Sequence, residues 1–189
     1  MIKAVIFDMY ETLITLFEST LYFGPQMAVD AGIPKEKFLE SWNPTEYDRS
    51  IGNMTLEEAL EIVLVNNGCY SKKLFDTLVY KRIAVKEESF RHIHPEIIPL
   101  LKRLKECEIK IGLISNCFSE EVDLIEKSVL YSYFDAICLS YKEGIVKPNT
   151  EIYARCMEKL HVNAGECLYV GDGGSQELET ARTLGMQTV

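Results

Sequence analysis

Short apolar runs alternate with amphipathic segments along much of the chain. Four runs are predominantly apolar, too short for helices and rich in residues that favour strands; they span 4–7, 109–114, 134–139 and 167–170. Helical spacing of apolar residues predicts helices over 95–107, 120–130, 150–160 and 176–184. Buried strands that alternate with helices predict an α/β fold with a parallel sheet and right-handed crossovers. Residues 185–189 indicate the start of a fifth strand.

The segment 16–92 breaks this alternation because it has no strand signal and several helix signals. Thr55 and Glu58 have the spacing of a capping box, which opens a helix. A segment of this length exceeds an ordinary connection between two strands. The sequence therefore predicts a helical unit, 16–92, inserted into an α/β core that is formed by 1–15 and 93–189.

Composition and charge narrow the classes of partner. The 189 residues are 47% hydrophobic and 26% charged, which is typical of globular chains, and the net charge is −9. A net negative charge disfavours binding to nucleic acid and to anionic membranes. The six cysteines form no CxxC pair or zinc-like cluster, and the first residues resemble a strand rather than a leader peptide. We therefore expect a cytoplasmic protein, monomeric or homodimeric, with a small-molecule partner.

Polar side chains with catalytic chemistry follow the predicted strands. Asp8 and Ser115 come directly after the first two strands, Lys147 lies shortly beyond the third, and Asp172 follows the fourth. Ligands of parallel α/β sheets bind at the carboxyl ends of the strands, where these groups converge. An acid, a hydroxyl, a lysine and a second acid provide a nucleophile, an anion cradle and a metal site. Taken singly, each also has a structural interpretation: a helix cap for Ser115, a solvated loop lysine for Lys147 and a tight turn for Asp172.

Four motifs at these positions resemble those of the haloacid dehalogenase-like superfamily. They are DMYETL at 8–13, LISN at 113–116, GIVKPN at 144–149 and VGDGGSQE at 170–177. Their order and intervals match the superfamily pattern over nearly the whole chain, and the helical unit stands where the family places its helical, C1-type cap. The resemblance implies a three-layer Rossmann-like core and a hydrolase.

For the family's phosphatases, the resemblance implies covalent catalysis assisted by Mg²⁺. Asp8 would attack phosphorus and form an aspartyl-phosphate that water later hydrolyses. Mg²⁺ would offset the repulsion between the carboxylate and the phosphate dianion. Carried over residue by residue, its ligands are Asp8, the Tyr10 carbonyl oxygen and Asp172, with Glu177 holding a metal-bound water.

The remaining motif residues are expected to contact the substrate. Ser115 and Lys147 would hold the oxygens of the transferring group. Asn116 would donate through its backbone N–H or its side chain, and Thr12 would fix the turn after the first strand or touch the substrate.

The helical unit should carry selectivity for the substrate. Its polar candidates are Trp42, Tyr47, Arg49 and Arg91. Arg49 stands out because a guanidinium fork suits a carboxylate or a phosphate. A surface arginine is nevertheless the favoured interpretation of this residue, since most arginines are exposed.

Tyr10 departs from the phosphatase pattern, which has a general acid/base aspartate at this position. A phenol with an ordinary pKa near ~10 activates water poorly. Three interpretations follow: a phosphohydrolase that prefers leaving groups needing no proton, an enzyme closer to the 2-haloacid dehalogenases, or a binding module with weakened turnover. The neighbouring Glu11 is a possible substitute acid. The acids Asp172 and Glu177 favour the phosphohydrolase, because only a cation would satisfy three carboxylates in one pocket.

Overall fold

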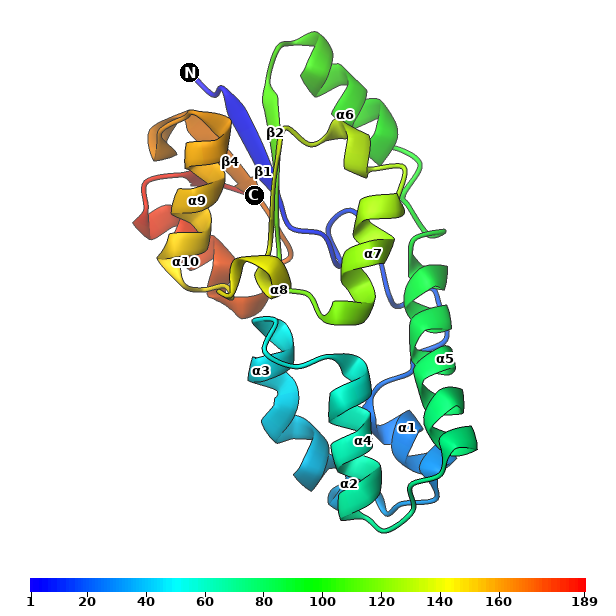
Figure 1. Ribbon diagram of the computed structural model, residues 1–189. Coiled ribbons are helices and arrows are strands. Elements are labelled where there is room, and N and C mark those ends of the chain that lie inside the picture. Colours follow the sequence, from blue (N-terminus) through cyan, green and yellow to red (C-terminus); the bar gives the residue numbers. More distant parts are fainter.

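A single five-stranded parallel sheet forms the centre of the computed structural model, which describes residues 1–189 (Figure 1). The strands are β1 (Ala4–Phe7), β2 (Lys110–Ser115), β3 (Ala136–Leu139), β4 (Cys167–Val170) and β5 (Gln187–Thr188). Their order is β3-β2-β1-β4-β5, and every neighbouring pair is parallel. The strand predicted from residue 134 begins two residues later, because the Asp135 carboxylate rather than a backbone carbonyl accepts the Ile111 N–H at 2.8 Å.

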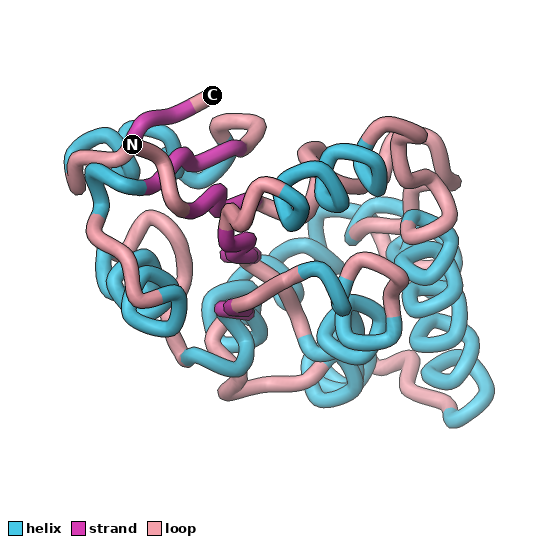
Figure 2. The backbone as a smooth tube through the Cα atoms, turned by 90° about the horizontal axis from the view of Figure 1, so that it is seen from above, coloured by secondary structure: helices cyan, strands magenta, loops and turns pink.

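Helices cover both faces of the sheet, which confirms the predicted three-layer α/β class. Helices α6 (Ile97–Glu106) and α7 (Ser119–Lys127) lie on one face, and α9 (Thr150–Leu160) and α10 (Glu177–Thr183) lie on the other (Figures 1 and 2). Side chains of each strand point alternately to the two layers. In β1, Ala4 and Ile6 pack in the cluster that includes α9, whereas Val5 and Phe7 pack in the cluster that includes α7. The short helix α8 (Ser140–Glu143) follows β3 directly.

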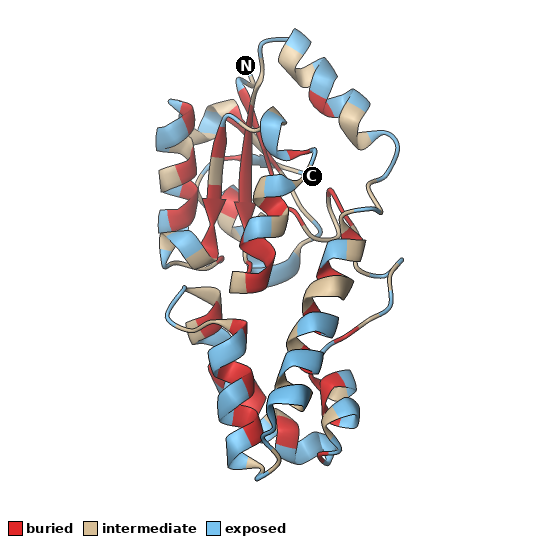
Figure 3. Ribbon diagram, turned by 45° about the vertical axis from the view of Figure 1, so that its right-hand side comes forward, coloured by how far each residue is buried: buried red, intermediate tan, exposed pale blue.

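The segment between β1 and α6 is helical and has its own apolar core (Figure 3). It contains α1 (Gly24–Ala31), α2 (Lys35–Trp42), α3 (Glu46–Ser50), α4 (Leu56–Asn66) and α5 (Lys72–Ser89). The predicted capping box opens α4: Thr55 Oγ1 accepts from the Glu58 N–H at 3.2 Å, and the Glu58 carboxylate accepts from the Thr55 N–H at 2.8 Å. Short 3₁₀ turns complete the chain at Asn43–Thr45, Tyr131–Tyr133, Ala164–Glu166 and Gly174–Gln176. Every helix is too short or too polar to cross a bilayer.

The helical segment packs against the loops at the carboxyl edge of the sheet. Helix α5 contacts α7, and the N–H of Leu56, the first residue of α4, donates to Ser119 Oγ at 2.9 Å. The turn after α3 also packs closely on α8, because a Cβ at Gly52 would overlap the backbone oxygen of Tyr141. Any ligand that binds at this edge of the sheet therefore lies between the two parts of the chain.

Candidate active site

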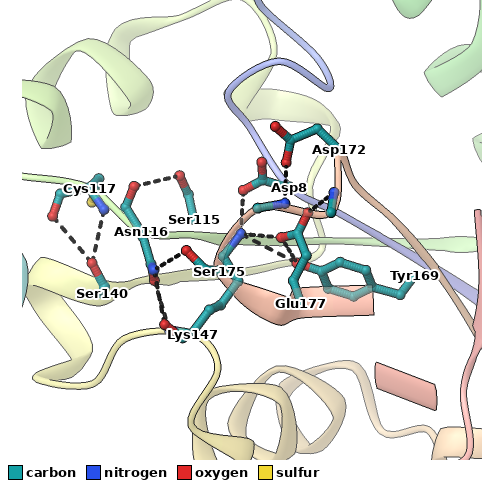
Figure 4. Close-up of polar contacts among 12 residues, drawn as sticks. Asp8, Ser115, Asn116, Cys117, Ser140, Lys147, Tyr169, Asp172, Ser175 and Glu177 are labelled. Carbon is teal, nitrogen blue, oxygen red and sulfur yellow. Dashed lines mark hydrogen bonds and ion pairs between the residues drawn. The ribbon is translucent and has the colours of Figure 1, made fainter. Parts of the chain in front are cut away.

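Three buried charged side chains meet at the carboxyl edge of the sheet (Figure 4). Asp8 follows β1, Lys147 lies on the loop between α8 and α9, and Glu177 is the first residue of α10. The Lys147 ammonium is 2.5 Å from Asp8 Oδ1 and 2.5 Å from Glu177 Oε2. Lys147 is only 5% exposed, so it is not a solvated loop lysine.

A third carboxylate completes an acidic cluster beside Lys147. Oxygens of Asp8, Asp172 and Glu177 lie within 4.8 Å of one another, and Asp172 is the exposed member. A Cβ at Gly171 would overlap Oε1 of Glu177, so the glycine makes room for this carboxylate. Hard oxygen donors from three acids, opposed by one lysine, are the chemistry that suits a divalent cation such as Mg²⁺.

The charge balance of the cluster is visible in the pKa of Asp8. Burial raises this pKa from 3.8 to about 6; Lys147 opposes the rise, and the Glu177 carboxylate adds to it. Lys147 therefore offsets only part of the rise that burial and the Glu177 carboxylate cause in the pKa of Asp8. A bound cation would supply the missing positive charge.

The loop after β2 positions Lys147 from the opposite side. The Asn116 side-chain oxygen accepts from the Lys147 N–H at 2.8 Å, and its amide nitrogen donates to the Lys147 carbonyl at 3.2 Å. The same nitrogen lies 3.3 Å from Ser175 Oγ. Asn116 thus clamps the backbone that carries the lysine, so its side chain is occupied and its backbone N–H stays the group expected to face a substrate.

Ser115 ends β2 as a fully buried side chain, whose only hydrogen bond is a long one of 3.4 Å to the Asn116 carbonyl. Helix α7 starts at Ser119 with Phe118 as its N-cap, so Ser115 does not cap it. The hydroxyl is weakly engaged and free to turn toward a ligand.

Tyr10 turns its hydroxyl into a buried position without a hydrogen-bond partner. Its ring packs edge-on against Phe90, and the Lys86 ammonium lies 5.0 Å from the ring centroid. Burial and then the nearby Glu121 carboxylate hold the pKa of Tyr10 well above its usual value. The phenol therefore stays protonated near neutral pH and does not act as a base.

Glu11 does not replace the missing acid. Its backbone is left-handed, with φ of 58°, and its carboxylate accepts from the Thr15 hydroxyl at 2.7 Å and from the Leu16 N–H at 2.8 Å. These contacts fix the turn after β1. The Thr12 hydroxyl in the same turn is buried and has no hydrogen-bond partner.

Arg49 is not a surface residue, so that interpretation of the sequence is wrong. It is 3% exposed and lies between two aromatic rings, 3.9 Å from the Trp42 centroid and 4.5 Å from that of Phe118. Phe118 belongs to the loop after β2, so Arg49 brings the helical segment into contact with the site.

Two buried ion pairs beside Arg49 were missed by sequence reasoning. Arg82 pairs with Glu120 at 3.1 Å, and Lys86 pairs with Glu121 at 2.5 Å. The signal was present, because Arg82 and Lys86 lie four residues apart on α5 and in line with the buried Leu78. Charged residues at such spacing usually indicate a solvated face.

The edge of this parallel α/β sheet thus brings together three carboxylates, a hydroxyl and a buried lysine. A family model described as haloacid dehalogenase-like hydrolase matches residues 2–185. The chain belongs to this family and is a hydrolase.

Among curated proteins, the chain is similar to two archaeal glyceraldehyde 3-phosphate phosphatases. It is 23% identical to that of Methanopyrus kandleri, over 100% of this chain and 83% of the relative, and 26% identical to that of Methanocaldococcus jannaschii, over 100% and 84%. Among solved structures, it resembles the HAD family enzyme BT-2542 from Bacteroides thetaiotaomicron, solved with magnesium and inorganic phosphate. The TM-score is 0.73 at 20% identity, over 100% of this chain and 93% of that one. This structural likeness establishes the fold alone.

Proposed function

We propose that this hydrolase is a Mg²⁺-dependent phosphohydrolase that acts on a small phosphorylated metabolite through an aspartyl-phosphate on Asp8. The observation that carries the proposal is the convergence of Asp8, Lys147, Asp172 and Glu177 at one edge of the sheet. The two relatives named as phosphatases over the full length of the chain support the same reaction class.

In the proposed reaction, an Asp8 carboxylate oxygen attacks phosphorus, the bond to the leaving oxygen breaks, and the phosphoryl group passes to Asp8. Water then attacks phosphorus and releases inorganic phosphate, which regenerates Asp8. Lys147 lies within hydrogen-bond distance of Asp8, so it can hold a phosphoryl oxygen while orienting the nucleophile. The Ser115 hydroxyl and the Asn116 N–H would hold the other oxygens.

The residues present fit a divalent metal. Asp8, the Tyr10 carbonyl oxygen and Asp172 would hold it, and Glu177 would support it through a water molecule. Bound there, Mg²⁺ supplies the positive charge that allows a carboxylate to approach a phosphate dianion. Asp172 is the most exposed of the three acids, so its side chain has the most freedom to move when a metal ion binds.

We propose that residues 16–92 form the cap and that 1–15 and 93–189 form the catalytic core. The separate apolar core of the helical segment supports this division. Contacts from α4 to Ser119 and from α5 to α7 would hold the cap closed over the site. Closure would exclude water from the pocket and present the cap residue Arg49 to the substrate.

Because its raised pKa makes the buried Tyr10 phenol a very weak acid, and because Glu11 is engaged elsewhere, the rate should depend steeply on the leaving group. With Mg²⁺, p-nitrophenyl phosphate should turn over at least about 10²-fold faster than a simple alkyl phosphate, since general acid assistance contributes about 10²–10⁴-fold where it exists. Tyr10→Asp should narrow this ratio, and chelation of Mg²⁺ should abolish both activities. Steady-state rates with and without metal measure each effect.

Tyr10 also favours one alternative, because the 2-haloacid dehalogenases resemble this chain at that position. A halide leaves as a stable anion and needs no acid. Metal-independent chloride release from 2-chloropropionate, without phosphatase activity, would establish that alternative and contradict the proposed phosphohydrolase activity.

A further inference from the structure

A cavity of about 450 Å³ lies between the helical segment and the loop after β2. Tyr10 and Asn116 line it on the core side; Tyr10 comes two residues after Asp8, and Asn116 directly follows Ser115. Arg49, Arg82 and Lys86 line it from the helical segment. A substrate whose phosphate reaches Asp8 would therefore extend its other end toward three cationic side chains.

Two of these cations are already neutralised. Arg82 donates to Glu120 at 3.1 Å and to the Tyr22 carbonyl at 2.7 Å, and Lys86 contacts Glu121 at 2.5 Å. All four charged side chains are at least nine-tenths buried. These two ion pairs join α5 to α7, and each pair has no net charge.

Arg49 has no such partner. Its Nε donates to Thr45 Oγ1 at 2.9 Å, its Nη1 is buried without any hydrogen-bond partner, and no carboxylate lies within ion-pair distance. A buried guanidinium without a counter-ion lowers the stability of the fold. For the same reason, burial lowers the pKa of Arg49 to about 10. The buried cations are Arg49, Arg82 and Lys86, and the buried carboxylates are those of Glu120 and Glu121. One positive charge is therefore unbalanced. Glu46 also lines the cavity, but it is exposed and makes no ion pair with Arg49.

We propose that the substrate carries a second anionic group, a carboxylate, which binds Arg49 while the phosphate lies at Asp8. This inference rests on the proposed phosphohydrolase function and names its substrate class: a short phosphorylated carboxylic acid. A carboxylate accepts two parallel N–H bonds from a guanidinium and matches the single unbalanced charge. The Trp42 and Phe118 rings fix the plane of the guanidinium. An aldehyde or an alcohol at this position would leave Arg49 unpaired.

Matched pairs of phosphates test the proposal. 3-Phosphoglycerate and glyceraldehyde 3-phosphate differ only in carboxylate against aldehyde, and 4-phosphoerythronate and erythrose 4-phosphate form a four-carbon pair. In wild type with Mg²⁺, the acid of at least one pair should have the higher kcat/KM. Arg49→Met should lower kcat/KM for that acid about 10²-fold and for its aldehyde less than about threefold. Arg49→Lys should retain only part of the wild-type kcat/KM for the acid, because an ammonium group cannot donate two parallel N–H bonds to a carboxylate.

Arg103→Met is the matched control, because Arg103 lies on α6, outside this cavity, and its side chain is 72% exposed. It should leave both activities unchanged. Equal kcat/KM for acid and aldehyde in both pairs, or an equal fall for both substrates in Arg49→Met, would overturn the proposal.

A second readout separates this inference from the proposed function. Trp42 is the only tryptophan of the chain and stacks on Arg49, so its fluorescence reports ligands there. In the Asp8→Asn variant, 3-phosphoglycerate or 4-phosphoerythronate should change Trp42 fluorescence, and Arg49→Met should weaken that binding about 10²-fold. Binding of this kind without turnover in wild type would reject the phosphohydrolase but keep the Arg49 site. Turnover of phosphates without Arg49-dependent binding would keep the phosphohydrolase and reject the site.

Discussion

Asp8→Asn should lower kcat for p-nitrophenyl phosphate by at least about 10³-fold, because an amide oxygen cannot form the covalent phosphoryl intermediate. The substitution keeps the size of the side chain and its place after β1. The p-nitrophenolate anion leaves readily without a proton, so the absent acid at Tyr10 does not mask the effect. Release of p-nitrophenol by both proteins in Mg²⁺ measures it.

The same variant should be more stable than wild type without metal. Burial raises the folded-state pKa of Asp8 from 3.8 to about 6. As the pH rises through this window, the unfolded chain releases a proton that the folded chain retains, so wild type loses stability. Relative to wild type, Asp8→Asn should gain up to about 3 kcal/mol in free energy of unfolding between about pH 4 and 7. Urea unfolding of both proteins in EDTA at several pH values would measure this difference in free energy of unfolding. A difference that stays constant, or that falls as the pH rises, would contradict the assigned charge balance.

Lys147→Met should lower the free energy of unfolding by about 3–5 kcal/mol in EDTA and abolish turnover. The side chain is the only cation within reach of Asp8 and Glu177, and its loss leaves two buried carboxylates unpaired. Mg²⁺ should narrow the gap to wild type, because the metal supplies charge at the same cluster. Urea titrations with and without Mg²⁺ give both values.

Lys142→Met is the control for this change. Lys142 also pairs with a carboxylate, that of Glu126, but it is half exposed, so its loss should cost at most about 1 kcal/mol. Equal effects of the two substitutions would show that the buried ion cluster at Asp8 contributes no more than a surface pair.

The fold and the converging residues followed from the sequence because both depend on short-range patterns. The continuous apolar run of β1 and the helical spacing of α9 specify buried elements, and α9 has the bounds that were predicted. A polar residue directly after a parallel strand must lie at its carboxyl edge, which brings Asp8 and Asp172 together.

The environment of the cap residues did not follow from the sequence, because it depends on how two parts of the chain pack. Arg49 is covered on one side by Trp42 of the helical segment and on the other by the Phe118 ring from the loop after β2. Glu121 is buried by Lys86, which lies far away in sequence. The direction of the Glu11 side chain likewise depends on a left-handed backbone that no pattern indicated.

Trapping the covalent intermediate shows directly whether Asp8 is the nucleophile. Wild type mixed with p-nitrophenyl phosphate and Mg²⁺ is quenched in acid, and the peptide that contains Asp8 is analysed by mass spectrometry. We expect one added phosphoryl group on Asp8, which should be absent after chelation of the metal. Turnover without any phosphoryl group on Asp8, or turnover that persists in Asp8→Asn, would contradict this expectation.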